Sequence, residues 1–94
     1  MSQPTVISDI TTVTGVADVV IDDTALWVSP GQTPAGRYWT LFTAADNRLA
    51  GVVVEHNGLY EAVIRQSVAS TATAQDAALL LVAALHAPNP KGSE

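Results

Sequence analysis

The chain has 94 residues, a formal net charge of −5 and no cysteine, which predicts a single domain without disulfides or zinc–thiolate sites. Four basic side chains against nine acidic ones offer little attraction to phosphate, so we expect no nucleic-acid partner. The longest apolar run, residues 77–85, is far shorter than the ~20 residues of a membrane-spanning helix, so we expect no membrane partner either.

The N-terminal third is rich in β-branched residues. Residues 1–5 are expected to be a flexible tail without the features of a signal peptide, which favours a cytoplasmic location. A short helix over Val16–Asp23, capped by Thr14, is an alternative for part of the segment that follows. Pro30–Gly36 is predicted to be an irregular loop, because its prolines and glycines disrupt regular structure. The β-branched residues favour three strands, over Val6–Val13, Val16–Ile21 and Ala25–Ser29.

The segment from Arg37 to Ala87 has the pattern of three strands followed by a helix. Asn57-Gly58 lies between two β-branched runs and predicts a two-residue hairpin turn. A second turn at Asp46-Asn47 would set Leu41 opposite Val52, whereas a turn of odd length would move the first strand's side chains to the other face. The hairpin at Asn57-Gly58 predicts four pairs: His56 with Leu59, Val54 with Glu61, Val52 with Val63, and Gly51 with Ile64.

A helix is predicted over Ala74–His86. Thr73 is the expected N-cap, and Asp76 three residues later completes a variant of the capping box. Pro88 ends the helix, and residues 88–94 are expected to be a second flexible tail. The helix is apolar on almost every side, whereas a surface helix normally shows a polar stripe.

Both faces of the predicted sheet are substantially apolar. An antiparallel sheet with one face in water should show one clearly polar face. The excess apolar surface on sheet and helix therefore predicts contact with another chain, and a homodimer is the commonest solution. The residues expected at this interface are Trp39, Leu41, Val52, Val54, Val63, Leu79 and Val82.

No pattern in the chain predicts catalysis, a cofactor or a metal site. The glycine spacing of Gly31–Tyr38 suggests a phosphate loop, but Lys is missing and a strand follows instead of a helix. Asp22-Asp23 is best explained as a solvated turn, and Glu55 points away from its neighbour His56 on a strand. His86 suits the end of a helix. We therefore expect a non-enzymatic protein without cofactors.

The strand order and the Ala-rich helix, together with Trp39 and Tyr60–Ala62, resemble small integrase-arm DNA-binding domains and the latter part of double-stranded-RNA-binding domains. The resemblance is one of topology and assigns no site residue, whereas a small nucleic-acid-binding regulator, considered as an alternative in its own right, would use Arg37, Arg48 and Arg65. Those families place basic residues on the sheet or at the helix start, where this chain has acidic ones.

The expected fold is α+β: an antiparallel sheet, made of a C-terminal β-β-β-α unit and additional N-terminal strands, packs against one C-terminal helix. The expected function is that of a homo-oligomeric bacterial or bacteriophage accessory or regulatory protein that binds another protein. A structural subunit of a virion or assembly is the first alternative, and a small nucleic-acid-binding regulator is the second.

Overall fold

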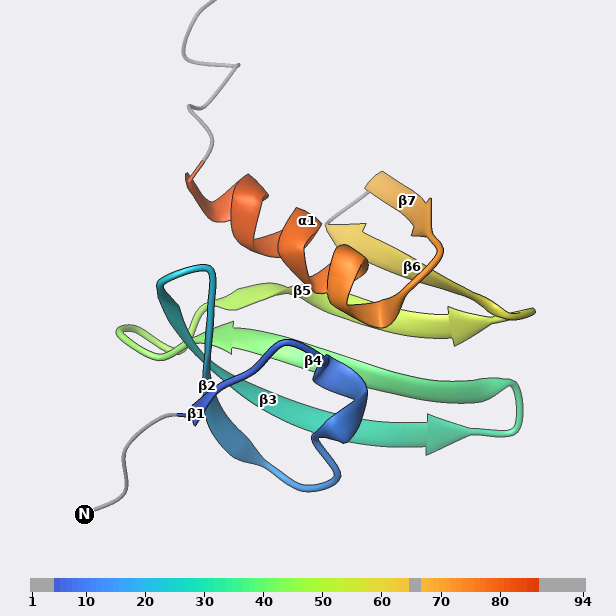
Figure 1. Ribbon diagram of the computed structural model, residues 1–94, viewed down its shortest axis with the longest axis horizontal. Coiled ribbons are helices and arrows are strands. Elements are labelled where there is room, and N and C mark those ends of the chain that lie inside the picture. The colour runs from blue at the N-terminus through green and yellow to red at the C-terminus, as the bar shows by residue number, and fades with distance from the viewer. Residues whose placement is uncertain (1–4, 65–66, 87–94) are drawn as a thin grey trace, which may run out of the picture.

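A computed structural model describes residues 5–64 and 67–86 of the chain, which form one mixed sheet with a helix on one side (Figure 1). The sheet follows chain order from β1 to β7, with β1 parallel to β2 and every other neighbouring pair antiparallel. The strands are β1 (Thr5–Val6), β2 (Ala17–Ile21), β3 (Thr24–Thr33), β4 (Gly36–Thr43), β5 (Leu49–His56), β6 (Leu59–Ile64) and β7 (Ser67–Thr71). A 3-10 turn, η1 (Ile10–Thr12), follows β1, and the helix α1 (Ala74–His86) follows β7.

The predicted α+β class with one C-terminal helix is confirmed, but the sheet is not purely antiparallel. The chain leaves β1, passes through η1 and returns beside β1 in the same direction, which makes the first pair parallel. The C-terminal unit also differs from the predicted β-β-β-α order, because β7 lies between β6 and the helix. Thr5 pairs with Val19, so the predicted N-terminal tail overlaps β1 at this residue. The rest of that tail and residues 88–94 lie outside the described ranges.

The predicted strand over Val6–Val13 is wrong, because Asp9 begins a 3-10 turn inside it. The Asp9 carboxylate accepts hydrogen bonds from the backbone N–H and the hydroxyl of Thr11, at 3.0 and 2.6 Å. Such local bonds compete with the pairing that a strand needs. The turn carries Ile10 into the core.

The alternative helix over Val16–Asp23 is also wrong, and the predicted strand is confirmed by β2. Asp22 and Asp23 have positive φ angles of 51° and 62° and connect β2 to β3. Positive φ at both central residues is typical of a tight hairpin turn. These residues therefore end the strand, and the chain reverses direction.

The predicted irregular loop over Pro30–Gly36 is wrong over most of its length. β3 continues to Thr33 and β4 begins at Gly36, so only two residues connect the strands. Position 31 in β3 requires glycine, because the Tyr38 ring occupies the space that a side chain would fill. An added Cβ would lie 2.2 Å from the Tyr38 Cζ.

The Asn57-Gly58 hairpin is confirmed, together with three of the four predicted pairs between β5 and β6, while the pair of Gly51 with Ile64 stays a prediction. Asn57 and Gly58 have φ angles of 52° and 80°. The predicted register between β4 and β5 is wrong by one residue, since Leu41 lies opposite Gly51 and not Val52. The register shifts near Ala50, where a β-bulge places an extra residue in β5. This shift moves the β4 side chains to the opposite face, as an odd-length turn would have done.

The helix has the predicted bounds and the predicted cap. The Thr73 hydroxyl accepts a hydrogen bond of 3.1 Å from the backbone N–H of Asp76. α1 packs mainly on β5 and β6, and His86 lies 2.6 Å from the Thr24 hydroxyl at the start of β3. Leu81 sits directly over Gly51, where an added Cβ would come within 2.5 Å of its Cδ2. The missing side chain at Gly51 therefore lets the helix approach the sheet closely.

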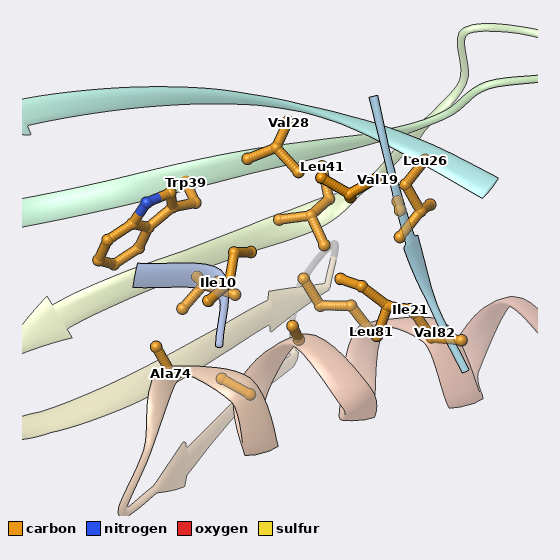
Figure 2. Packing of buried hydrophobic residues seen from close by; sticks show 14 of the residues in the cluster. Ile10, Val19, Ile21, Leu26, Val28, Trp39, Leu41, Ala74, Leu81 and Val82 are labelled. Atoms are coloured by element: carbon orange, nitrogen blue, oxygen red, sulfur yellow. The ribbon is translucent and has the colours of Figure 1, made fainter. Parts of the chain in front are cut away.

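The hydrophobic core lies between the sheet and the layer formed by α1 and η1 (Figure 2). The Trp39 side chain is only 1% exposed. Its indole N–H donates a 3.2 Å hydrogen bond to the carbonyl of Val13, the residue that follows η1 in the chain. The largest fully buried residues are Trp39, Ile10, Ile21, Leu26, Leu41, Leu81, Val19, Val28, Val53 and Val82. They come from both halves of the chain and lie together on the helix side of the sheet. The N-terminal segment therefore helps to cover this side and leaves the other side open.

Candidate functional site

The face of the sheet that α1 does not cover is apolar and partly exposed; we call it the open face. Pairing places side chains in rows across the strands, and one row runs through Val68, Val63, Val52 and Thr40. None of these residues is buried. The other apolar side chains of the open face are Val20, Ala25, Trp27, Tyr38, Phe42, Leu49 and Val54. Its charged side chains within the described strands are Asp18 and Glu61.

Two stacked aromatic rings form the most ordered part of the open face. The rings of Trp27 and Phe42 have centroids 4.1 Å apart and are inclined by 14°. The Trp27 indole N–H donates a 2.7 Å hydrogen bond to the Asn47 side-chain oxygen in the β4–β5 loop. Both rings remain partly exposed. This arrangement holds a large apolar surface in one orientation, which lowers the entropy lost when another surface packs on it.

The seven residues expected at an interface are divided between the two sides of the sheet. Trp39, Leu41 and Val82 are buried in the core beneath α1, so they contact this chain's own residues. Leu79 is 38% exposed on the outer surface of α1. Val52, Val54 and Val63 lie together on the open face and are partly exposed.

Trp27 and Phe42 belong to the open face but were absent from the expected set. The signal that would have found them is Gly51 after Ala50, since glycine inside a strand often marks a bulge. A bulge there moves Trp39 and Leu41 to the helix side. It sets Phe42 and its paired residue Trp27 on the open face.

On the helix side, Arg37, Glu55 and Tyr60 form a polar group beside Trp39. The Arg37 guanidinium donates to both Glu55 carboxylate oxygens at 3.4 Å and lies 5.1 Å from the centre of the Trp39 ring. The Tyr60 hydroxyl donates to Glu55 at 3.4 Å. A cavity of about 290 Å³ next to this group is lined by Arg37, Trp39, Pro30, Val13 and neighbouring residues. Among the lining residues that the structure describes, Arg37 is the ionisable one.

Hydrogen bonds from the side chain and then the backbone of Arg37 hold the pKa of Glu55 below its ordinary value of 4.5. The folded protein therefore binds this proton less readily than the unfolded chain, and the resulting stability is present above pH 4.5 and is lost as the pH falls through the folded pKa. In a carboxyl-carbon NMR titration, we expect the Glu55 midpoint to lie below 4.5 and Arg37→Gln to raise it toward that value. Arg48→Gln is the control, because it removes the ion-pair partner of Asp46 and leaves Arg37 beside Glu55. Equal midpoints in wild type and Arg37→Gln would contradict this account.

The remaining candidate residues do not converge on one site. His56 lies next to Asn57 at the β5–β6 turn. His86, the last residue of α1, contacts Thr24 at the start of β3. Glu55 pairs with Arg37 on the helix side of the sheet. Within residues 5–64 and 67–86, no group of three or more His, Asp or Glu side chains is arranged to hold a metal ion.

Among the helices in the part of the chain that the structure describes, none combines the length and apolar character needed to cross a membrane. Glycines 31 and 36 lie in the paired strands β3 and β4, so the glycine spacing of this segment belongs to a hairpin. Comparison of the chain with protein-family models, with curated proteins and with solved structures found no match.

Proposed function

We propose that this chain is a non-enzymatic, homo-oligomeric protein-binding module whose open face packs against an apolar surface of another protein. The observation that carries the proposal is the Trp27–Phe42 stack on the same face as the row of exposed or partly exposed valines Val52, Val63 and Val68. Aromatic residues held in position are enriched among the anchors of protein interfaces. A face turned permanently to water would be expected to carry polar side chains.

The low charge of the open face supports a protein partner over a nucleic acid. The arginine side chains in the described ranges lie elsewhere: Arg37 pairs with Glu55 on the helix side, and Arg48 lies near Asp46 in a loop. Asp18 and Glu61 would repel phosphate. The proposal includes a cytoplasmic location, which the absence of cysteine supports, and a bacterial or bacteriophage source.

The test is a comparison of partners captured from the source organism by three forms of the protein. Val54→Lys places a charge on the open face, and Glu61 directly opposite gives it a favourable cross-strand pair, so the fold is retained. Ser8→Lys adds the same charge at an exposed position before η1 and is the matched control. We expect a partner that binds the wild type and Ser8→Lys, with affinity at least tenfold lower for Val54→Lys when measured with purified proteins.

Trp27 provides a second readout on the same complex. Its partly exposed ring should lose accessibility to acrylamide when the partner binds, whereas the buried Trp39 contributes little change. If the captured partner binds Val54→Lys as tightly as the wild type and leaves Trp27 accessible, the open face is not the binding surface.

A further inference from the structure

β7 is an outer strand of the sheet with an unguarded edge. It pairs with β6 on one side, and no strand among the described residues pairs with its other side. Its sequence, Ser67-Val-Ala-Ser-Thr71, contains no charge and no proline, and Val68 is 59% exposed. Natural sheets normally guard such edges with charges, prolines, bulges or very short strands. Within the described residues the opposite edge follows this rule, since β1 spans only Thr5–Val6.

We propose that β7 is a dimerisation edge, on which a second copy of this chain pairs its own β7 in antiparallel orientation. The two sheets would then form one continuous sheet with a two-fold axis next to Ala69, the central residue of β7. The inference rests on the proposed function, because it names the homo-oligomeric contact of the same module.

The absence of charge on β7 favours a second copy as the occupant. In a two-fold interface residue i of one copy meets residue j of the other and j meets i, so a strand with charges of one sign would repel its own copy. The whole chain carries a net charge of −5, yet β7 is neutral. A foreign peptide added to the edge would need pockets beside it for alternate side chains. Neither of the two cavities beside Val13 is lined by a β7 residue.

The flank of α1 next to this edge is also apolar. His86 contacts Thr24 and therefore marks the flank of α1 that faces the β2–β3 turn. Successive helical residues are rotated by about 100°, which places Leu80 and Ala84 on the other flank. Leu80 is 41% exposed although it lies in the middle of the helix. Two copies joined at β7 would bring these flanks toward each other above the new strand pair and bury more apolar surface than the strands alone.

Antiparallel pairing keeps the two open faces on the same side of the joined sheet. The two-fold axis of such a pair runs perpendicular to the sheet, so both α1 helices lie on one side and both open faces lie on the other. Val68 is paired with Val63 and continues the valine row of the open face to the edge. The dimer therefore presents one apolar surface with twice the extent of a single open face.

Sedimentation equilibrium tests the oligomeric state. We expect the wild type to dimerise, Ala69→Lys to raise the dimer dissociation constant at least tenfold because the new charges meet at the axis, and Thr5→Lys at the opposite edge to leave it unchanged. Circular dichroism checks that each variant is folded. A wild type that stays monomeric at millimolar concentration, a dimer unaffected by Ala69→Lys, or assembly into particles larger than a dimer would overturn the proposal.

The absence of cysteine makes a positional test possible as well. Under mild oxidation, Ala69→Cys should form a disulfide-linked dimer in higher yield than Val68→Cys or Ser70→Cys, because only position 69 meets itself across the axis. Equal or lower yield at position 69 contradicts the proposed register. Val54→Lys separates the two proposals, because it should keep the β7 dimer while losing the partner of the open face. If instead Val54→Lys loses the dimer and Ala69→Lys keeps it, self-association takes place on the open face.

Discussion

Gly51→Ala is expected to lower the free energy of unfolding by roughly 2–5 kcal/mol, since it combines backbone strain with overpacking. Gly51 has a φ of +154°, which side chains with a Cβ rarely adopt. Its added methyl group would lie 2.5 Å from Leu81 Cδ2 and 2.7 Å from the Val63 carbonyl oxygen. Relief of the contact with Leu81 requires movement of α1 or of the Leu81 side chain. The carbonyl belongs to the neighbouring strand, so relief of that contact requires movement of the β5–β6 pairing.

Urea denaturation measures this effect, and two other glycines divide it into its causes. Gly15→Ala meets no atom within 4 Å and is expected to unfold like the wild type. Gly58→Ala also meets open space but has a φ of +80°, so it reports the cost of backbone strain alone. Gly51→Ala should be the least stable of the three, with a melting temperature lowered by about 4–8 °C for each kcal/mol. Equal stability of Gly51→Ala and Gly15→Ala would show that α1 does not rest on the backbone at this point.

Gly51 also explains why one sheet register was predictable and the other was not. The β5–β6 register depends on a tight turn whose length is visible in the sequence, because Asn57 and Gly58 both accept positive φ. The β4–β5 register depends on the loop over residues 44–48 and on the bulge at Ala50. A bulge is set by packing around one residue, and its only local sign is the glycine that follows it.

The same distinction applies to the ends of the chain's regular elements. The bounds of α1 were predictable because Thr73 supplies a local cap and Pro88 cannot continue the helix. Pro30 argued against a strand, yet it lies within β3 opposite Trp39. Pairing along the rest of a ten-residue strand outweighs one missing donor. β7 was not predicted, because its short Ser- and Thr-rich sequence has no marked alternation and gains its pairing from β6.

The candidate site was predictable as a property of the chain rather than as a set of residues. The excess of apolar surface was visible in the composition of the strands, and an apolar face uncovered by α1 is present in the fold. Three of the expected interface residues, Val52, Val54 and Val63, lie on that face because the Asn57-Gly58 hairpin determined their register. Trp39 and Leu41 lie on the opposite side because the bulge reversed β4 relative to β5.

The two tryptophans, one on each side of the sheet, give the second large prediction. Trp39→Leu is expected to cost about 3–5 kcal/mol in the free energy of unfolding, because it opens a cavity in the core and leaves the Val13 carbonyl without its donor. The indole is 1% exposed, and its contacts reach from η1 to the Tyr60 ring, whose centroid is 6.4 Å away. Its loss should therefore loosen the N-terminal cover over the core as well as the sheet.

Trp27→Leu is the matched control, because it removes the same side chain from the open face. Trp27 is partly exposed and loses mainly its stack on Phe42 and its bond to Asn47, so we expect a cost of about 1 kcal/mol. Each variant keeps one tryptophan, so urea unfolding can be followed by fluorescence in both, and acrylamide should quench the native state of Trp39→Leu more strongly. If the two substitutions lower the free energy of unfolding equally, the open face must be covered as the core side is, which requires a second copy. Measuring the loss of stability in Trp27→Leu at several protein concentrations tests this cover, since only a contribution from association depends on concentration.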